Sequence, residues 1–433
     1  MIANKPKARS GSMKTRTQNT ETPFEKDSKT VHNHIEDILP KLIDEPSSDI
    51  PFTRLHPGYL DDYNSTSYLW DQYFCALRFY EAGKIAFLKD HVSLFLKFQN
   101  PDNGFVPGTI SFTKDRKHCP GNSSRTGATF IAQAALQYIQ HSNDIAWAKT
   151  IFSKLEKYIE SYKIIQPRQL VQMGKFQELP FGLYSNVGGG IDNDPCKFFL
   201  ESSAKVEGNC YFYLEILSMS KIADMLKQRD KSKKYAAEAE SLKNAINKYC
   251  WNNEDSIYYN ILLEGAPQIK LKCFSGLVPL FAGIADKKQA DKIVRNTVMN
   301  DEMFLSPFGL RSMSKDCIFY NNALVGNPPP HYHLNCYNAS NWQGPVWVLV
   351  NFQIVEGLVN YGYCEEAQEI TRRMIKTLAA DIRKNGVMHE NYHAETGQEL
   401  FCKGFGSWNV LADVMLSRIG KKATVLKAIK SQR

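Results

Sequence analysis

Residues 341–362, NWQGPVWVLVNFQIVEGLVNYG, contain the two features on which the fold prediction rests. The first part is a loop rich in aromatic and amide side chains, and the second has the apolar spacing of a buried helix. Helical segments of this kind recur along the chain, whereas strand-like runs are short, as around 257–263. The predicted helices cover residues 69–81, 83–98, 126–140, 143–163, 204–227, 232–250, 271–283, 287–299, 344–361, 363–381 and 405–418.

Long loops separate these predicted helices and collect most of the unusual residues. Loops of this length are uncommon in compact domains unless they are functional or disordered, and these are too aromatic to be disordered. Antiparallel helix pairs with long loops at alternate junctions predict an all-α fold, an (α/α)6 barrel (toroid) whose loops form a pocket at one mouth. A large irregular helical bundle is the alternative.

Composition sets the expected organisation of the chain. Its 433 residues are 43% hydrophobic and 12% aromatic, which is enough for a large core. Residues 1–30 are polar and are expected to form a disordered basic tail, residues 31–420 the barrel, and residues 421–433 a basic C-terminal tail. Neither a membrane helix nor a signal peptide is evident, so we expect a cytoplasmic protein without a membrane partner.

The net charge of +8 lies at the two ends of the chain. Residues 1–30 carry seven basic and three acidic side chains, and residues 421–433 carry five basic side chains and no acidic one. The remaining body is therefore nearly neutral, which argues against a nucleic-acid partner. The ten cysteines form no C-x-x-C pair and are expected to be reduced thiols.

Four segments combine carboxylates with aromatic and amide side chains. Sugars have apolar C–H faces for stacking and hydroxyl groups for hydrogen bonding, so this mixture is typical of a sugar site. Taken alone, each segment has a simpler explanation, such as a core tryptophan beside a capping carboxylate. The segments are Tyr68–Tyr73 (YLWDQY), Gly188–Asp194 (GGGIDND), Asn341–Trp347 (NWQGPVW) and His389–His393 (HENYH).

Two of these segments invite other interpretations. The glycines before Asp192 match neither common phosphate-binding pattern, and the plain alternative for Asp192 and Asp194 is a capped turn. His389, Glu390 and His393 match H-E-x-x-H, which binds zinc only when it lies on a helix. A glycine shortly before the motif and Thr-Gly after it argue against that helix.

Taken in order, the four segments resemble those of glycoside hydrolase family 63 and, more distantly, the trehalases. Family members carry W-D-S-[YF]-F, G-[LM]-D-N, [NY]-W-R-G-P-[VI]-W and E-x-Y-x-x-x-T-G segments. The corresponding stretches here are Trp70–Phe74, Gly190–Asn193, Asn341–Trp347 and Glu390–Gly397. The resemblance covers roughly residues 50–420 and is greatest to the stand-alone barrels of the mannosylglycerate and glucosylglycerate hydrolases.

The resemblance implies an (α/α)6 barrel that hydrolyses a small α-glucoside or α-mannoside with inversion and needs neither a metal nor another cofactor. Asp192 would be the general acid and Glu390 the general base, with their carboxyl groups roughly 6.5 to 9.5 Å apart. Burial among aromatic rings would keep Asp192 protonated. The implied substrate-binding residues are Tyr68, Trp70, Asp71, Gln72, Gly190, Asn193, Trp342, Gln343, Gly344, Trp347, Tyr392 and Trp408.

The chain departs from the family pattern at two places. Gln343 replaces the usual arginine, which removes a cationic contact and can change the aglycone. Asp194 and Cys196 replace part of the Ser-Pro-Arg that often follows the acid. The alternatives left open are a trehalase, a sugar-binding barrel without activity, and a zinc peptidase.

Overall fold

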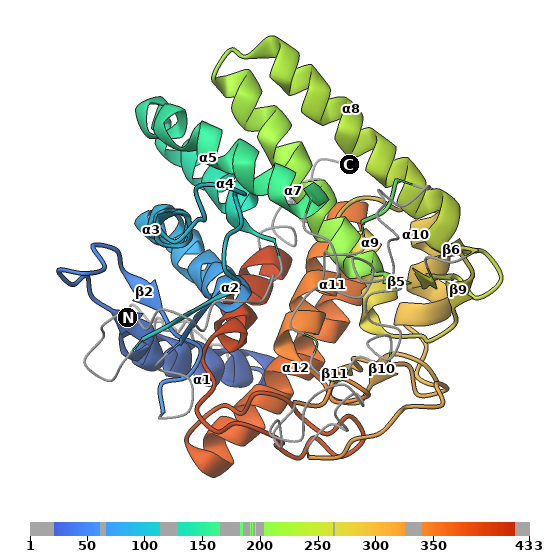
Figure 1. Cartoon of the computed structure of the whole chain (residues 1–433). Coiled ribbons are helices and arrows are strands. Elements are labelled where there is room, and N and C mark those ends of the chain that lie inside the picture. The colour runs from blue at the N-terminus through green and yellow to red at the C-terminus, as the bar shows by residue number, and fades with distance from the viewer. Residues whose placement is uncertain are drawn as a thin grey trace, which may run out of the picture.

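The computed structural model is a ring of helices in which inner and outer helices alternate along the chain (Figure 1). The outer helices are α1 (Pro23–Ile38), α3 (Ala86–Lys97), α5 (Ile145–Ile164), α8 (Arg229–Ala245), α10 (Lys287–Ile293) and α12 (Cys364–Asn385). The inner helices are α2 (Leu69–Glu81), α4 (Ile131–Ser142), α7 (Val206–Met225), α9 (Val278–Phe281), α11 (Val348–Tyr361) and the helix over residues 411–420. The structure describes residues 21–60, 66–112, 129–164, 182–184, 191, 193, 195, 203–262, 265–324 and 340–420.

The two sets of helices differ in how they are buried. Inner helices such as α11 are buried on almost every side, because the segment VLVNFQIV is mainly apolar and its two polar residues, Asn351 and Gln353, are themselves buried and hydrogen-bonded. Outer helices bury one stripe only, and α1 does so with Val31, Ile35 and Ile38. Inner helices pack against both kinds of neighbour, as α7 does against the inner α4 and α9 and the outer α5 and α8. This is the arrangement of an (α/α)6 barrel, and the predicted fold class is confirmed.

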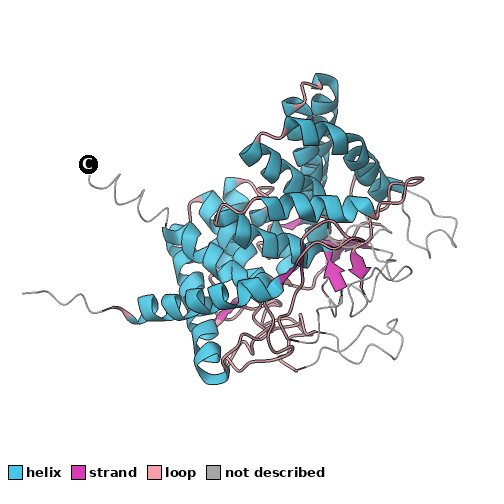
Figure 2. Ribbon diagram, turned by 90° about the vertical axis from the view of Figure 1, so that its left-hand side faces the viewer, coloured by secondary structure: helices cyan, strands magenta, loops and turns pink. Residues whose placement is uncertain are grey.

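Short strands and long loops lie together on one side of the helices (Figure 2). The strands pair antiparallel in sheets of two or three. Isolated bridges link loops that are far apart in sequence, including Arg311 with Val346 and Val346 with Tyr392. The strands are β1 (Ile43–Asp44), β2 (Arg54–Leu55), β3 (Thr66–Tyr68), β4 (Thr109–Ser111), β5 (Ser203–Ala204), β6 (Trp251–Asn252), β7 (Ile257–Tyr258), β8 (Asn260–Leu262), β9 (Gln268–Ile269), β10 (Leu305–Ser306) and β11 (Gly309–Leu310).

A buried carboxylate from one inner helix caps the next. Glu215 of α7 accepts hydrogen bonds from the backbone N–H groups of Ile131, Ala132 and Gln133, at 2.8 to 3.1 Å. These donors have no partner within α4, because they belong to its first turn. Burial raises the pKa of Glu215, whereas the N–H groups act in the opposite direction. Glu215 thus fixes the start of α4 against α7.

Most predicted helices are confirmed, with two corrections. The expected tail over residues 1–30 is wrong from Pro23 onward, because Thr22 and Glu25 form a capping box that starts α1. The predicted helix over 271–283 is mostly not α-helical, since a 3₁₀ helix (Phe274–Leu277) precedes the four-residue α9. The tails over 1–20 and 421–433 lie outside the described residues. Within the described part of the chain, no helix has both the length and the apolarity to cross a membrane.

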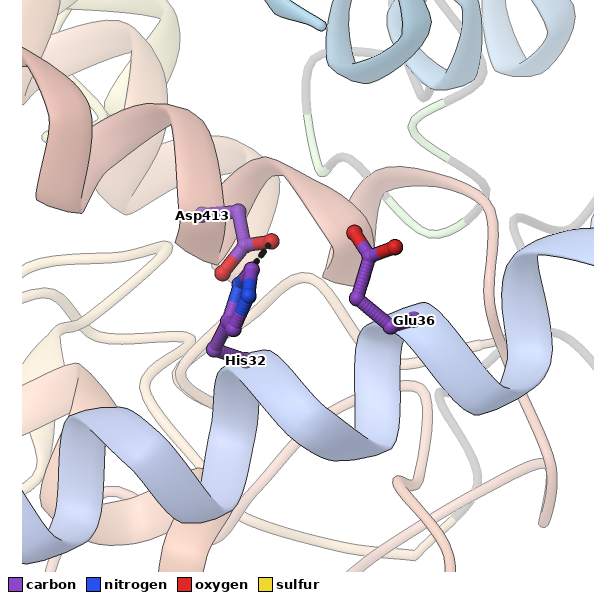
Figure 3. A group of neighbouring side chains, drawn as sticks. All are labelled: His32, Glu36 and Asp413. Carbon is purple, nitrogen blue, oxygen red and sulfur yellow. Dashed lines mark hydrogen bonds and ion pairs between the residues drawn. The ribbon is translucent and has the colours of Figure 1, made fainter.

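The ring closes where α1 and α2 meet the helix over residues 411–420. Arg78 of α2 donates to Asp413 at 2.9 Å and also to Glu36 of α1. His32, one turn before Glu36 on α1, places its Nδ1 3.0 Å from the same Asp413 carboxylate (Figure 3). Three helices from the two ends of the chain are therefore joined by one guanidinium group.

Candidate active site

Four tryptophans meet around the loop over residues 341–347. The rings of Trp342 and Trp347 are stacked, with centroids 3.8 Å apart and planes inclined by 10°. Trp70, at the start of α2, lies 6.3 Å from Trp342. Trp408, in a 3₁₀ helix before the last described helix, lies 5.8 Å from Trp70 and 5.9 Å from Trp347. The stacked rings of Trp342 and Trp347 thus each cover one face of the other.

The residue after the candidate acid is bonded to the same loop. Asn193 is buried, its Nδ2 donates to Asn341 Oδ1 at 3.0 Å, and its Oδ1 accepts from the backbone N–H of Trp342 at 2.6 Å. Its carbonyl oxygen accepts from Gln343 Nε2 at 2.8 Å. These bonds fix the position of the residue that follows Asp192 in the chain.

Gln343 uses both ends of its amide within the protein. While Nε2 donates to Asn193, Oε1 accepts from Asn321 Nδ2 at 2.9 Å. The backbones also meet, because Asn321 N–H donates to the Gln343 carbonyl at 2.8 Å. A methyl group on Gly344 would overlap the Asn321 carbonyl oxygen, so this approach requires glycine.

The candidate base lies on a segment that pairs with the same loop. Val346 N–H donates to the Tyr392 carbonyl at 2.8 Å, and Tyr392 N–H returns a bond to Val346 at 3.0 Å. Glu390 is buried, and its N–H donates to the Cys402 carbonyl. The Tyr392 hydroxyl donates to Asp381 of α12 at 2.8 Å, and burial raises the pKa of Tyr392 well above its ordinary value.

The first predicted segment also belongs to this cluster. Tyr68 ends β3 and directly precedes α2. Asp71 is buried, and its Oδ1 accepts from Ser407 Oγ at 3.0 Å. That bond joins α2 to the loop before Trp408.

Three buried side chains in these segments have polar atoms without a partner in the described part of the chain. They are both amide atoms of Gln72, both amide atoms of Asn391, and Nε1 of Trp408. Buried polar groups are almost always hydrogen-bonded, so these groups are exceptions within the described part of the chain. Sequence reasoning named Gln72 and Trp408 but missed Asn391, which is the neighbour of Glu390.

The structure therefore brings together the segments that carry Glu390 and the residues named as substrate-binding, except Gly190. Gly190 and Asp192 lie outside the described residues, as do Asp194 and Cys196. Sequence reasoning missed Asn321, Asn341 and Asp381, which hold these segments in place. Of these three residues, only Asn341 could have been found from the sequence, because it belongs to one of the four motifs.

The H-E-x-x-H segment is extended and not helical. His389 N–H and Nδ1 both lie 2.9 Å from an oxygen of Asp381. His393 Nδ1 accepts from the backbone N–H of Glu395 at 3.1 Å. The two imidazoles thus do not share the helix face that zinc-peptidase geometry requires.

Another group of possible metal ligands lies at the ring closure. Within the residues described, His32, Glu36 and Asp413 are the only such group of three, and their ligand atoms lie within 4.8 Å of one another (Figure 3). Arg78 already donates to both carboxylates. We therefore assign the group to ion pairing between helices.

A helical barrel whose loops bring together tryptophans, amides and a buried carboxylate has the features of a carbohydrate-active enzyme. Residues 191–408, half of the chain, match the family described as the mannosylglycerate hydrolase MGH1-like glycoside hydrolase domain. The chain belongs to this family, and the resemblance inferred from the four segments is confirmed.

Individual relatives match over shorter stretches. Mannosylglycerate hydrolase MGH1 of Selaginella moellendorffii is 30% identical over 123 residues, which is 28% of this chain and 20% of that protein. The mannosylglycerate hydrolase of Thermus thermophilus is 26% identical over 168 residues, which is 39% of this chain and 35% of that protein. The chain thus aligns with about a fifth to a third of the length of these curated relatives.

Solved structures support the fold over most of the chain. A family 63 mannosylglycerate hydrolase from Thermus thermophilus, in complex with Tris and D-glycerate, superposes with a TM-score of 0.66 and 17% identity. That match covers 89% of this chain and 100% of the other. Neutral trehalase Nth1 from Saccharomyces cerevisiae gives 0.62 and 17%, over 89% of this chain and 79% of that one.

Proposed function

We propose that this protein is an inverting α-glycosidase that hydrolyses a small α-glycoside of the hexosylglycerate type. Asp192 acts as the general acid and Glu390 as the general base. The observation that carries this proposal is that one seven-residue loop, 341–347, is hydrogen-bonded to both Asn193, next to Asp192, and Tyr392, two residues after Glu390. One short piece of chain therefore holds a close sequence neighbour of each candidate carboxylate.

The spacing along this loop suits the reaction. Gln343 and Val346 are three residues apart, which limits their Cα separation to roughly 11 Å. An inverting enzyme needs carboxyl groups roughly 6.5 to 9.5 Å apart, so that a water molecule fits between the base and the sugar. The acid protonates the leaving oxygen while the base takes a proton from the water. Asp71 supplies negative charge near the oxocarbenium ion that develops.

The substrate class follows from the chemistry of the cluster and from the relatives. Gln72, Asn391 and Trp408 offer buried neutral hydrogen-bonding groups without partners in the described part of the chain, which suit sugar hydroxyls. The matched relatives are mannosylglycerate hydrolases. A panel of mannosylglycerate, glucosylglycerate, trehalose, kojibiose, nigerose and maltose, assayed by sugar release, distinguishes the proposed class from a trehalase or a barrel that only binds.

Stereochemistry tests the mechanism directly. Because water displaces the leaving group in one step, an α-linked substrate releases the β-anomer first. Proton NMR in the first minutes, before mutarotation mixes the anomers, measures this. Initial release of the α-anomer would indicate retention and carboxyl groups nearer 5 Å apart. It would remove Glu390 from the role of base.

Variants test the two assigned carboxylates. Asp192→Asn and Glu390→Gln should each lower kcat by about 10²- to 10⁴-fold, the usual contribution of general acid or base catalysis. Asp194→Asn and Glu395→Gln are the matched controls, each close in sequence to one candidate. A larger loss in a control than in its neighbour would move the role to that control residue.

A further inference from the structure

The backbone carbonyl of the residue that follows the candidate acid is held by one side chain from the opposite loop. Gln343 Nε2 donates to the carbonyl oxygen of Asn193 at 2.8 Å, and both residues are buried. Asn193 is joined to Asp192 by a single peptide bond. A side chain that fixes this carbonyl therefore acts on the backbone one residue away from the proposed proton donor.

The amide of Gln343 is itself fixed. Its Oε1 accepts from Asn321 Nδ2, and the backbone N–H of Asn321 donates to the Gln343 carbonyl. Because an amide accepts at one end and donates at the other, the bond from Asn321 leaves Nε2 directed at Asn193. Both polar ends of Gln343 are thus occupied by protein.

We propose that Gln343 is a positioning residue that holds Asp192 in place for proton transfer to the leaving oxygen. This inference rests on the proposed function and gives Gln343 a task other than contact with the aglycone. In the step concerned, the bond between the anomeric carbon and the glycosidic oxygen breaks. The proton of Asp192 passes to that oxygen, and the water that loses its proton to Glu390 supplies the new bond to carbon.

The dependence on the leaving group separates this role from a general structural one. An alkoxide leaving group needs protonation, whereas fluoride leaves with little help from an acid. A displaced acid therefore slows hydrolysis of an alkyl glycoside and leaves hydrolysis of the matching glycosyl fluoride almost unchanged. A disturbed barrel slows both reactions equally.

The experiment compares mannosylglycerate with α-mannosyl fluoride, or the glucosyl pair if the panel selects glucose. Gln343→Met keeps the length of the side chain and removes both hydrogen bonds. Its kcat should fall by about 10²-fold on the glycerate compound, as for a misplacement of about 1 Å, and by less than about threefold on the fluoride. KM should change little.

A second variant and a control keep the test decisive. Asn321→Ala removes the side chain that orients the Gln343 amide, and Asn321 lies in a loop that is only half-buried. This variant should lose less kcat than Gln343→Met, with the same selectivity for the glycerate compound over the fluoride. Gln353→Leu is the control, because Gln353 is equally buried but bonds Tyr211 of α7. Any loss in this control should be equal on both substrates.

Equal losses on both substrates for Gln343→Met and Asn321→Ala would overturn the positioning role. Asp192→Asn distinguishes this from failure of the proposed function. If Asp192→Asn shows the selective loss and the Gln343 variant does not, only the positioning role is wrong. If Asp192→Asn retains activity on the glycerate compound, the assignment of the acid is wrong, and the role of Gln343 falls with it.

Discussion

His91 shows how strongly this core perturbs a single residue. It is fully buried in α3, between the rings of Tyr73 and Phe95, and its Nε2 lies 3.3 Å from the carbonyl oxygen of Phe130. Its Nδ1 has no partner in the described residues. Burial lowers the pKa of His91 from 6.5 to about 3. The folded protein therefore keeps this imidazole neutral at neutral and mildly acidic pH.

We predict that His91 makes the protein sensitive to mild acid. Between pH 6.5 and about 3 the unfolded state binds a proton at His91 and the folded state does not. Stability therefore rises with pH in this window, by up to about 1.4 kcal/mol per pH unit for this one group. Urea unfolding at pH 5 and pH 7.5 measures the slope, which should be smaller for His91→Phe. If the stability of the wild-type protein and that of His91→Phe changed equally with pH, His91 would not be the source of the acid sensitivity.

At the scale of single elements, the loop over 341–347 depends on a close approach to the backbone of Asn321. Gly344 lies against the carbonyl oxygen of Asn321 and the ring of Tyr320. The same contact allows Asn321 to reach Gln343 on both backbone and side chain. A larger residue at 344 would separate the two loops.

Gly344→Ala should therefore be both less stable and less active. Overpacking at a well-packed position costs roughly 1 to 3 kcal/mol, and the Asn321 bond to Gln343 should be lost with it. Chemical unfolding and kcat on the preferred glycoside report the two effects. Gly420→Ala is the control, because a methyl group there meets no atom within 4 Å. If Gly344→Ala were as stable and as active as Gly420→Ala, the close approach of Gly344 to the Asn321 carbonyl oxygen would not be needed.

Helix prediction succeeded where apolar spacing was strong. The predicted helix over 69–81 coincides with α2, and the one over 344–361 begins only at Val348 because Pro345 and the bridged Val346 precede it. Helix α1 was missed, since the basic composition of residues 1–30 obscured a capping box. Thr22 and Glu25 were the available signal.

The site was predictable in its residues but not in its contacts. The order of the four motifs along the chain identified Trp70, Trp342 and Glu390, and the segments that carry these residues do meet in the structure. Nothing local indicates that Gln343 would bond the carbonyl of Asn193, 150 residues earlier. Such a bond depends on how the ring brings distant loops together, and spacing within a motif carries no information about that.

At the scale of the whole molecule, the ion pairs around Arg78 join the two ends of the ring, alongside the packing of α1 against α12. Arg78 and Asp413 are both nearly buried, with exposed side-chain fractions of 9% and 8%. The guanidinium also reaches the more exposed Glu36. Removing one partner of a buried pair leaves an uncompensated charge, which costs more than the pair itself contributes.

Arg78→Met should lower the free energy of unfolding by about 3 kcal/mol and increase hydrogen exchange in α1. Arg295→Met is the matched control. Its ion pair with Asp291 is exposed on the surface, so its loss should change stability by less than about 1 kcal/mol. Denaturant unfolding and hydrogen exchange measure both proteins. A similar effect in the two would show that the ring closure adds no particular stability.

Ring closure also determines when the protein can finish folding during its synthesis. The contact between Arg78 and Asp413 spans 335 residues, so the seam stays open until almost the whole barrel has left the ribosome. At about 5 to 20 residues per second, the nascent chain waits tens of seconds for Trp408 and the final helix. Throughout that interval the inner face beside α2 is exposed to water.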